Sequence, residues 1–214
     1  MICNQYKLES NNNKILIGIA GAPSSGKDKM AEALSAALTN KSEKVPEEAR
    51  KYIQENGKLY SVFQQNIIYH RQKKLEEEIL RNYDVAVSSS PLFLAQFYAV
   101  LLKQEKILSA ELSTIADLYR KAIESLVSYD YVFLCAPLEN YDQDEIRYQN
   151  ATQVDTIHRS IAAFLDLHGK DYLLLPSATV NERLKMCLEY IGATKVVKKP
   201  LVNKKEMSSR IENL

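Results

Sequence analysis

The chain has 214 residues, of which 46% are hydrophobic and 26% are charged, and its formal net charge at pH 7 is +1. This length lets one domain bury a core without disulfides or metals, and the balanced charge argues against a strongly basic, nucleic-acid-binding or membrane-binding protein. The three cysteines are far apart and form no C-x-x-C pair, which argues against a disulfide framework or a zinc site.

Residues 1–14 are polar and lack the apolar core of a signal peptide, and no later run is long enough to cross a bilayer. We therefore expect a flexible N-terminal segment and a cytoplasmic protein. At the other end, residues 193–214 are expected to form a basic tail, which we interpret as solvated rather than as a site for an acidic partner.

The first predicted element is a buried parallel strand at 15–20, an apolar run rich in β-branched residues. It leads into a glycine loop, after which Met30, Leu34 and Ala37 lie on one face at helical spacing. Strand, glycine loop and amphipathic helix therefore follow one another directly.

Strands and helices continue to alternate along the rest of the chain. A second strand is expected to end near residue 46. Three further strands are expected at 85–87, 131–135 and 172–175. Helices are expected at 49–53, at roughly 60–81, in segments up to 127, and around 154–165. The long helix has an apolar stripe formed by Phe63, Ile67, Ile68, Leu75 and Ile79. Thr179 and Glu182 predict a capping box that opens a last helix, which should stop at Gly192.

Five strands separated by helices predict an α/β fold, in which a parallel sheet is covered by helices on both faces. The chain has no internal repeats and no linker rich in proline or glycine. We therefore expect one domain, spanning residues 15–192.

The glycine loop matches the phosphate-binding pattern G-x-x-x-x-G-K. Its residues are Gly21, Ala22, Pro23, Ser24, Ser25, Gly26 and Lys27. Glycines let backbone N–H groups approach phosphate oxygens, the lysine neutralises β- and γ-phosphate charge, and the following helix N-terminus adds a favourable field. We expect this loop, with Asp28 and Lys29 after it, to bind ATP.

Asp28 departs from the usual pattern, which has serine or threonine after the lysine to bind Mg²⁺ through its hydroxyl. A carboxylate beside the β- and γ-phosphates costs electrostatic energy unless a metal lies between them. Either Asp28 is a metal ligand, or the site does not handle Mg-ATP in the usual way.

Four stretches together resemble a known group of kinases: GAPSSGKDKMAEALSAAL, VPEEARKYI, FQQNIIYHRQKKLEEEIL, and YDQDEIR followed later by ATVNERL. The chain resembles the P-loop kinases related to the ribosylnicotinamide kinase domain of the bacterial NAD-biosynthesis regulator. Deoxynucleoside and nucleoside-monophosphate kinases are more distant relatives. The resemblance implies a P-loop NTPase fold with strand order 2-3-1-4-5, a small lid, and a phosphoryl acceptor bound between the second and third strands.

Three residues match the acceptor side of these kinases. Glu47 matches an acidic residue near the acceptor hydroxyl, Arg50 an arginine that holds the acceptor or a phosphate, and Gln72 a glutamine facing the acceptor pocket. Each has an alternative interpretation. Glu47 also suits a helix N-terminus, Arg50 suits an exposed ion pair with Glu47, and Gln72 suits a solvated helix position.

Two further matches concern the lid and the adenine. Arg147, in the polar segment 139–150, matches a lid arginine that stabilises charge on the transferring phosphoryl group, although an incidental surface arginine is the alternative. Residues 177–180 with Arg183 resemble the adenine-binding turn, and a helix cap without a ligand is the alternative.

The resemblance also implies an aspartate at the end of the third strand, where this chain has Ser88, Ser89 and Ser90. We interpret this change and Asp28 as a single exchange of carboxylate and hydroxyl across the metal site. Asp28 would bind Mg²⁺, supported by Ser88 or Ser89, because hard cations accept either arrangement of oxygen ligands.

The favoured function is therefore ATP-dependent phosphoryl transfer to a nucleoside, nucleotide or related small hydroxyl compound, with ATP and Mg²⁺ as cofactors. A nucleotide-binding pseudo-kinase that holds nucleotide without transfer is the main alternative, favoured by Asp28 and the serine run. The third is an NTPase that drives a partner.

Overall fold

The computed structural model describes residues 14–38, 41–59, 61–101, 109–138 and 151–196. The predicted lid at 139–150, residues 1–13 and residues 197–214 lie outside these ranges. Within them, no helix is long and apolar enough to cross a membrane.

Five parallel strands form one sheet in the order β2-β3-β1-β4-β5, which confirms the predicted topology. The strands are β1 (Ile15–Gly21), β2 (Ser42–Val45), β3 (Val85–Ser88), β4 (Tyr131–Cys135) and β5 (Leu173–Leu175). β1 and β3 are neighbours, with Gly18 opposite Ser88. The loop after β1 and the serines after β3 therefore emerge side by side at the carboxyl edge of the sheet.

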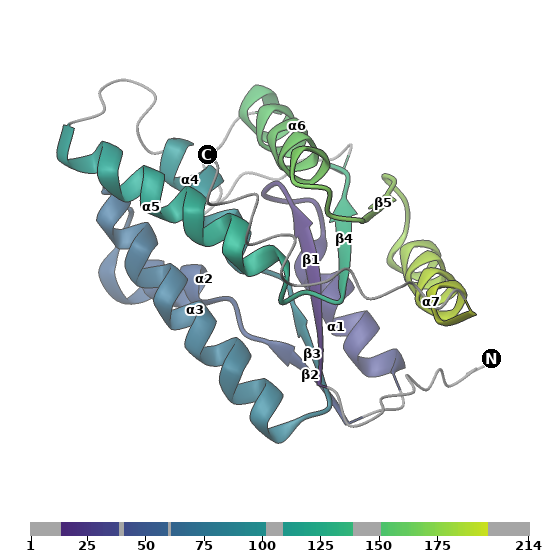
Figure 1. Cartoon of the computed structure of the whole chain (residues 1–214). Coiled ribbons are helices and arrows are strands. Elements are labelled where there is room, and N and C mark those ends of the chain that lie inside the picture. Colours follow the sequence, from purple (N-terminus) through teal and green to yellow (C-terminus); the bar gives the residue numbers. More distant parts are fainter. Residues whose placement is uncertain (1–13, 39–40, 60, 102–108, 139–150, 197–214) are drawn as a thin grey trace.

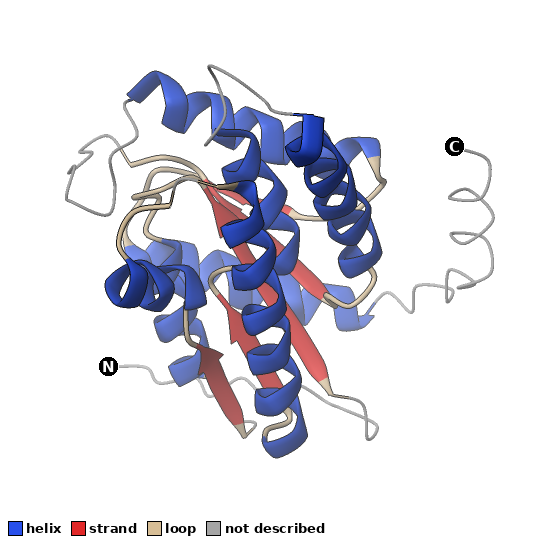
Figure 2. Cartoon of the chain, turned by 90° about the vertical axis from the view of Figure 1, so that its left-hand side faces the viewer, coloured by secondary structure: helices blue, strands red, loops and turns tan. Residues whose placement is uncertain are grey.

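Helices cover both faces of this sheet (Figures 1 and 2). They are α1 (Lys27–Ala37), α2 (Glu48–Asn56), α3 (Val62–Asn82), the short 3₁₀ helix η1 (Leu92–Leu94), α4 (Ala95–Leu101), α5 (Ser109–Leu126), α6 (Ala151–Leu167) and α7 (Val180–Val196). Alternate residues of β1 enter two cores because successive side chains of a strand point to opposite faces. Ile17 and Ile19 pack with α1 and α7, whereas Leu16 and Ala20 pack with the helices of the other face.

Two details of the helices differ from the sequence prediction. Phe63 and Ile67 of α3 are 50% and 44% exposed, and the buried face of that helix carries Gln65, Gln72 and Glu76 among its residues. The apolar stripe was therefore wrong at its N-terminal end, because α3 turns Val62, Gln65 and Tyr69 inwards there and leaves Phe63 and Ile67 on its outer side. The prediction that the last helix stops at Gly192 was also wrong. An interior glycine costs a helix only about 1 kcal/mol, and α7 continues to Val196.

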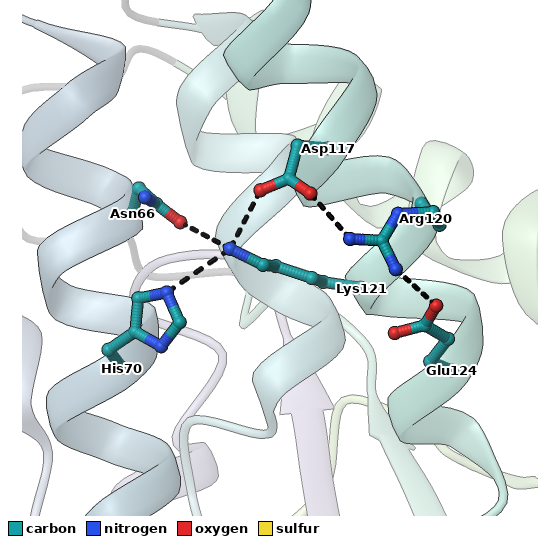
Figure 3. Close-up of polar contacts among 6 residues, drawn as sticks. All are labelled: Asn66, His70, Asp117, Arg120, Lys121 and Glu124. Atoms are coloured by element: carbon teal, nitrogen blue, oxygen red, sulfur yellow. Dashed lines mark hydrogen bonds and ion pairs between the residues drawn. The ribbon is translucent and has the colours of Figure 1, made fainter.

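A group of polar side chains joins α3 to α5 (Figure 3). Lys121 of α5 donates to Asn66 and His70 of α3, at 2.9 and 3.1 Å, and pairs with Asp117 on its own helix. Burial, followed by the charges of Lys121 and Lys73, lowers the pKa of His70, so its neutral ring accepts a hydrogen bond from Lys121. These contacts hold α3, a wall of the site described next, against the body of the protein.

Candidate nucleotide and acceptor site

The loop between β1 and α1 forms the phosphate cradle. Ser24 and Gly26 have φ values of 58° and 78°, the left-handed region that turns successive N–H groups towards one side. A Cβ on Gly21 would lie 2.4 Å from Ser25 Oγ and 2.9 Å from the Cys135 carbonyl oxygen, so only glycine fits there. Gly26 caps α1 without a side-chain hydrogen bond, which leaves the first N–H groups of the helix to an anion.

Arg183 of α7 supports this loop from inside the protein. Its side chain is only 2% exposed and donates to three carbonyl oxygens: Nη1 to Ser25 at 2.6 Å, Nε to Pro176 at 2.7 Å and Nη2 to Ala136 at 3.1 Å. The guanidinium thereby joins the cradle to the ends of β4 and β5. Arg183 does not line the cavity, so the contact with nucleotide that the resemblance implies stays a prediction.

A cavity of about 330 Å³ opens beside the cradle, between α2, α3 and the segment after β3. The predicted site residues that line it are Pro23, Ser24, Gly26, Lys27, Asp28, Lys29, Glu47, Arg50 and Gln72. Phosphate-side and acceptor-side candidates therefore share one space, although they come from different parts of the chain.

The acceptor side is built around the turn between β2 and α2. Glu47 is the N-cap residue of α2, and one of its carboxylate oxygens lies 3.5 Å from Arg50 Nε. Gln72 of α3 is 2% exposed, and its amide accepts from Glu48 N at 3.0 Å and donates to the Pro46 carbonyl at 3.2 Å. The solvated interpretation of Gln72 was therefore wrong. Its two hydrogen bonds fix the turn that carries Glu47.

Asp28 and Ser89 meet across the cradle. Ser89 Oγ donates to Asp28 Oδ1 at 3.1 Å, and Lys44 Nζ of β2 lies 2.7 Å from the same oxygen. Burial alone would raise the pKa of Asp28, but the hydrogen bond and charge of Lys44, with smaller effects of Ser89 and Arg50, hold it below its usual value. The Asp28 carboxylate is therefore ionised, and the Lys44 ammonium already lies beside it.

Ser88 is not brought to Asp28. It lies beside the buried carboxyl of Glu76, on the face of β3 opposite Lys44. In the part of the chain that the structure describes, no group of three or more histidine, cysteine, aspartate or glutamate side chains could hold a metal. Mg²⁺, however, needs only one or two carboxylates beside phosphate and water oxygens. Lys44 and Ser89 both contact Oδ1 of Asp28. The Asp28 carboxylate, with the Ser89 hydroxyl beside it, therefore has the chemistry of a single Mg²⁺ ligand.

Sequence reasoning missed Lys44, which contacts Asp28, and much of the cavity wall, of which Tyr98 is one residue. Tyr98 of α4 lines the cavity, and burial, opposed by Lys27 and assisted by Glu47, raises its pKa. Its hydroxyl therefore stays protonated near neutral pH. No local motif marks either residue, because each reaches the site only through the packing of its strand or helix.

Two other predictions have different outcomes. Arg147 and the rest of the lid lie outside the described residues, so its role stays a prediction. The capping box is confirmed: Glu182 Oε2 accepts from Thr179 N at 2.9 Å, and Glu182 N donates to Thr179 Oγ1 at 3.3 Å.

A family model described as an AAA domain matches residues 16–183 of the chain. The chain belongs to this AAA-domain family. A search of the curated proteins found no match.

Solved structures show the same fold. The structure of NadR in complex with NR aligns at a TM-score of 0.68 with 15% identity, covering 89% of this chain and 54% of that one. Deoxyadenosine kinase from M. mycoides with bound dATP aligns at 0.55 with 14% identity, covering 83% of this chain and 99% of the kinase. The chain thus spans about half the length of NadR and nearly all of the smaller kinase. The predicted P-loop kinase fold is confirmed.

Proposed function

We propose that this protein transfers the γ-phosphoryl group of ATP to a hydroxyl of a nucleoside, nucleotide or related small molecule. One observation carries the proposal: a single cavity is lined by the cradle lysine, Lys27, and by the acceptor-side residues Glu47, Arg50 and Gln72. The two structural neighbours were solved with NR and with dATP bound, which is consistent with acceptors and nucleotides of this class.

The transfer joins the acceptor oxygen to the γ-phosphorus and breaks the bond from that phosphorus to the β–γ bridging oxygen, so that ADP leaves. In this proposal Glu47 orients the acceptor hydroxyl and receives its proton, while Arg50 binds a polar group of the acceptor or a phosphate. Lys27 and the N-terminus of α1 neutralise charge on the phosphates, and Arg147 of the lid adds positive charge at the transferring group. Mg²⁺, held by Asp28 with Ser89 beside it, supplies further charge neutralisation when bound.

A nucleotide-binding protein without transfer activity is the second candidate. The ion pair between Lys44 and Asp28 favours it, because it occupies the carboxylate that metal-dependent transfer would use. The two candidates differ in whether ADP and a phosphorylated acceptor are formed.

ADP release with ATP, Mg²⁺ and a panel of nucleosides and nucleotides tests the proposal. We expect release that depends on one class of acceptor, with phosphorylated acceptor formed in equal amount. Nucleotide binding without any ADP release would establish the second candidate, and ADP release that needs no acceptor would establish an NTPase. The Lys27→Ala variant serves as the control for contaminating kinases.

A further inference from the structure

A positive side chain stands beside the cradle where P-loop kinases usually rely on a metal. Lys44 Nζ lies 2.7 Å from Asp28 Oδ1, the oxygen that also accepts from Ser89 Oγ. Asp28 lines the nucleotide cavity next to Lys27. The extra negative charge of Asp28 and a cation that offsets it therefore occur together.

The fold holds Lys44 in this place. In the parallel register Lys44 is opposite Val87, and the next residue, Val45, is fully buried on the other face of the sheet. Because side chains alternate along a strand, Lys44 lies on the face covered by α1, whose first turn carries Asp28. Its ammonium thereby reaches Asp28 at the carboxyl edge of the sheet.

This pair contributes little to folding, since both side chains are partly exposed, at 27% and 45%. Its effect on an anionic ligand is larger. Asp28 lies at the helix N-terminus, where a phosphate also binds, so the two negative charges compete for one positive field. A bare carboxylate about 6 Å from a phosphate charge weakens binding about tenfold at an effective dielectric constant of about 40.

We propose that Lys44 is the counter-ion that lets this cradle bind a nucleoside triphosphate without a divalent metal. The inference rests on the nucleotide site of the proposed function and specifies how that site handles charge. Mg²⁺ and Lys44 neutralise the same carboxylate, so each makes the other less necessary for nucleotide binding.

Calorimetric titration with ATP, in EDTA and in excess Mg²⁺, tests the proposal on wild type, Lys44→Met, Asp28→Asn and the double variant. We expect wild-type affinities in the two buffers to agree within about threefold. Lys44→Met should lose about tenfold in EDTA and recover most of that loss in Mg²⁺. In the double variant, which also lacks the negative charge, the EDTA affinity should return to near the wild-type value.

Lys14→Met is the matched control, because this substitution removes the same charge far from the cradle. Lys14 Nζ lies 3.3 Å from Asp84 Oδ1, at the amino edge of the sheet. Wild-type protein that binds ATP only with Mg²⁺ would overturn the inference while leaving the nucleotide site intact. So would a Lys44→Met variant that behaves like Lys14→Met. Absence of ATP binding in both buffers would overturn the proposed function together with the inference. Thermal unfolding of each variant shows whether it is folded, and rescue by the second substitution excludes general damage.

Discussion

A buried carboxyl behind the site gives the most quantitative prediction. Glu76 of α3 is 2% exposed, and the Tyr129 hydroxyl donates to its two oxygens at 3.0 Å. The same hydroxyl accepts from Leu92 N at 2.7 Å and so anchors the start of η1. Burial raises the pKa of Glu76 to about 8, although the neighbouring Ser88 hydroxyl and the hydrogen bonds from Tyr129 favour the ionised form.

The sign of the pH effect follows from this rise. In the unfolded chain Glu76 titrates near its ordinary value of 4.5, so between about pH 4.5 and 8 the folded protein holds one extra proton. The contribution of Glu76 to the free energy of unfolding is therefore complete below the unfolded pKa of 4.5 and is lost as pH rises through the folded pKa of about 8. Between these two pKa values the loss is about 1.4 kcal/mol for each pH unit. Over two units, from pH 5.5 to 7.5, the loss is about 3 kcal/mol.

Glu76→Gln keeps an acceptor for Tyr129 but cannot ionise, so it should abolish this part of the pH dependence. Urea denaturation at several pH values should show the variant gaining about 3 kcal/mol on the wild type between pH 5.5 and 7.5. Glu78→Gln, at an exposed position of the same helix, should follow the wild type throughout. Parallel stability curves for wild type and Glu76→Gln would refute the reasoning, because they would mean that Glu76 titrates alike in both states.

Three further predictions concern the cradle and the lid. Lys27→Ala should abolish stabilisation by ATP in thermal shift while leaving the apo protein folded, and unchanged ATP affinity would contradict the P-loop assignment. Arg147→Ala should lower kcat far more than it raises KM for ATP, and a preserved kcat would make Arg147 a binding residue only. Arg183→Met should cost about 3 kcal/mol in urea denaturation, because it leaves the buried Ser25 carbonyl and the two partly buried carbonyls of Pro176 and Ala136 without their donor. A cost within about 0.5 kcal/mol, typical of surface positions, would show that these hydrogen bonds are dispensable.

Much of the fold could be predicted because its strands, helices and glycine loop have patterns that involve only residues close together in the sequence. The strand at 15–20, the spacing from Gly21 to Lys27 and the helical period after it need only neighbouring residues to be recognised. The strand order rested on the resemblance, and the observed sheet confirms it. The capping box, also a local motif, formed as expected, whereas Gly192 did not end its helix because glycine only weakens one.

The charges of the site were decided by tertiary structure alone. Arg183 meets the Ser25 carbonyl across 158 residues, Ser89 meets Asp28 across 61, and Lys44 reaches Asp28 only because β2 presents it on the α1 face. Gln72 is buried for a similar reason, since packing places it against the turn before α2. No hydrophobic period or motif spacing in the sequence predicts these contacts between distant residues. The sequence by itself determined the P-loop pattern from Gly21 to Lys27 and the helix that follows it, and the packing of distant segments decided which charged side chains lie beside that loop.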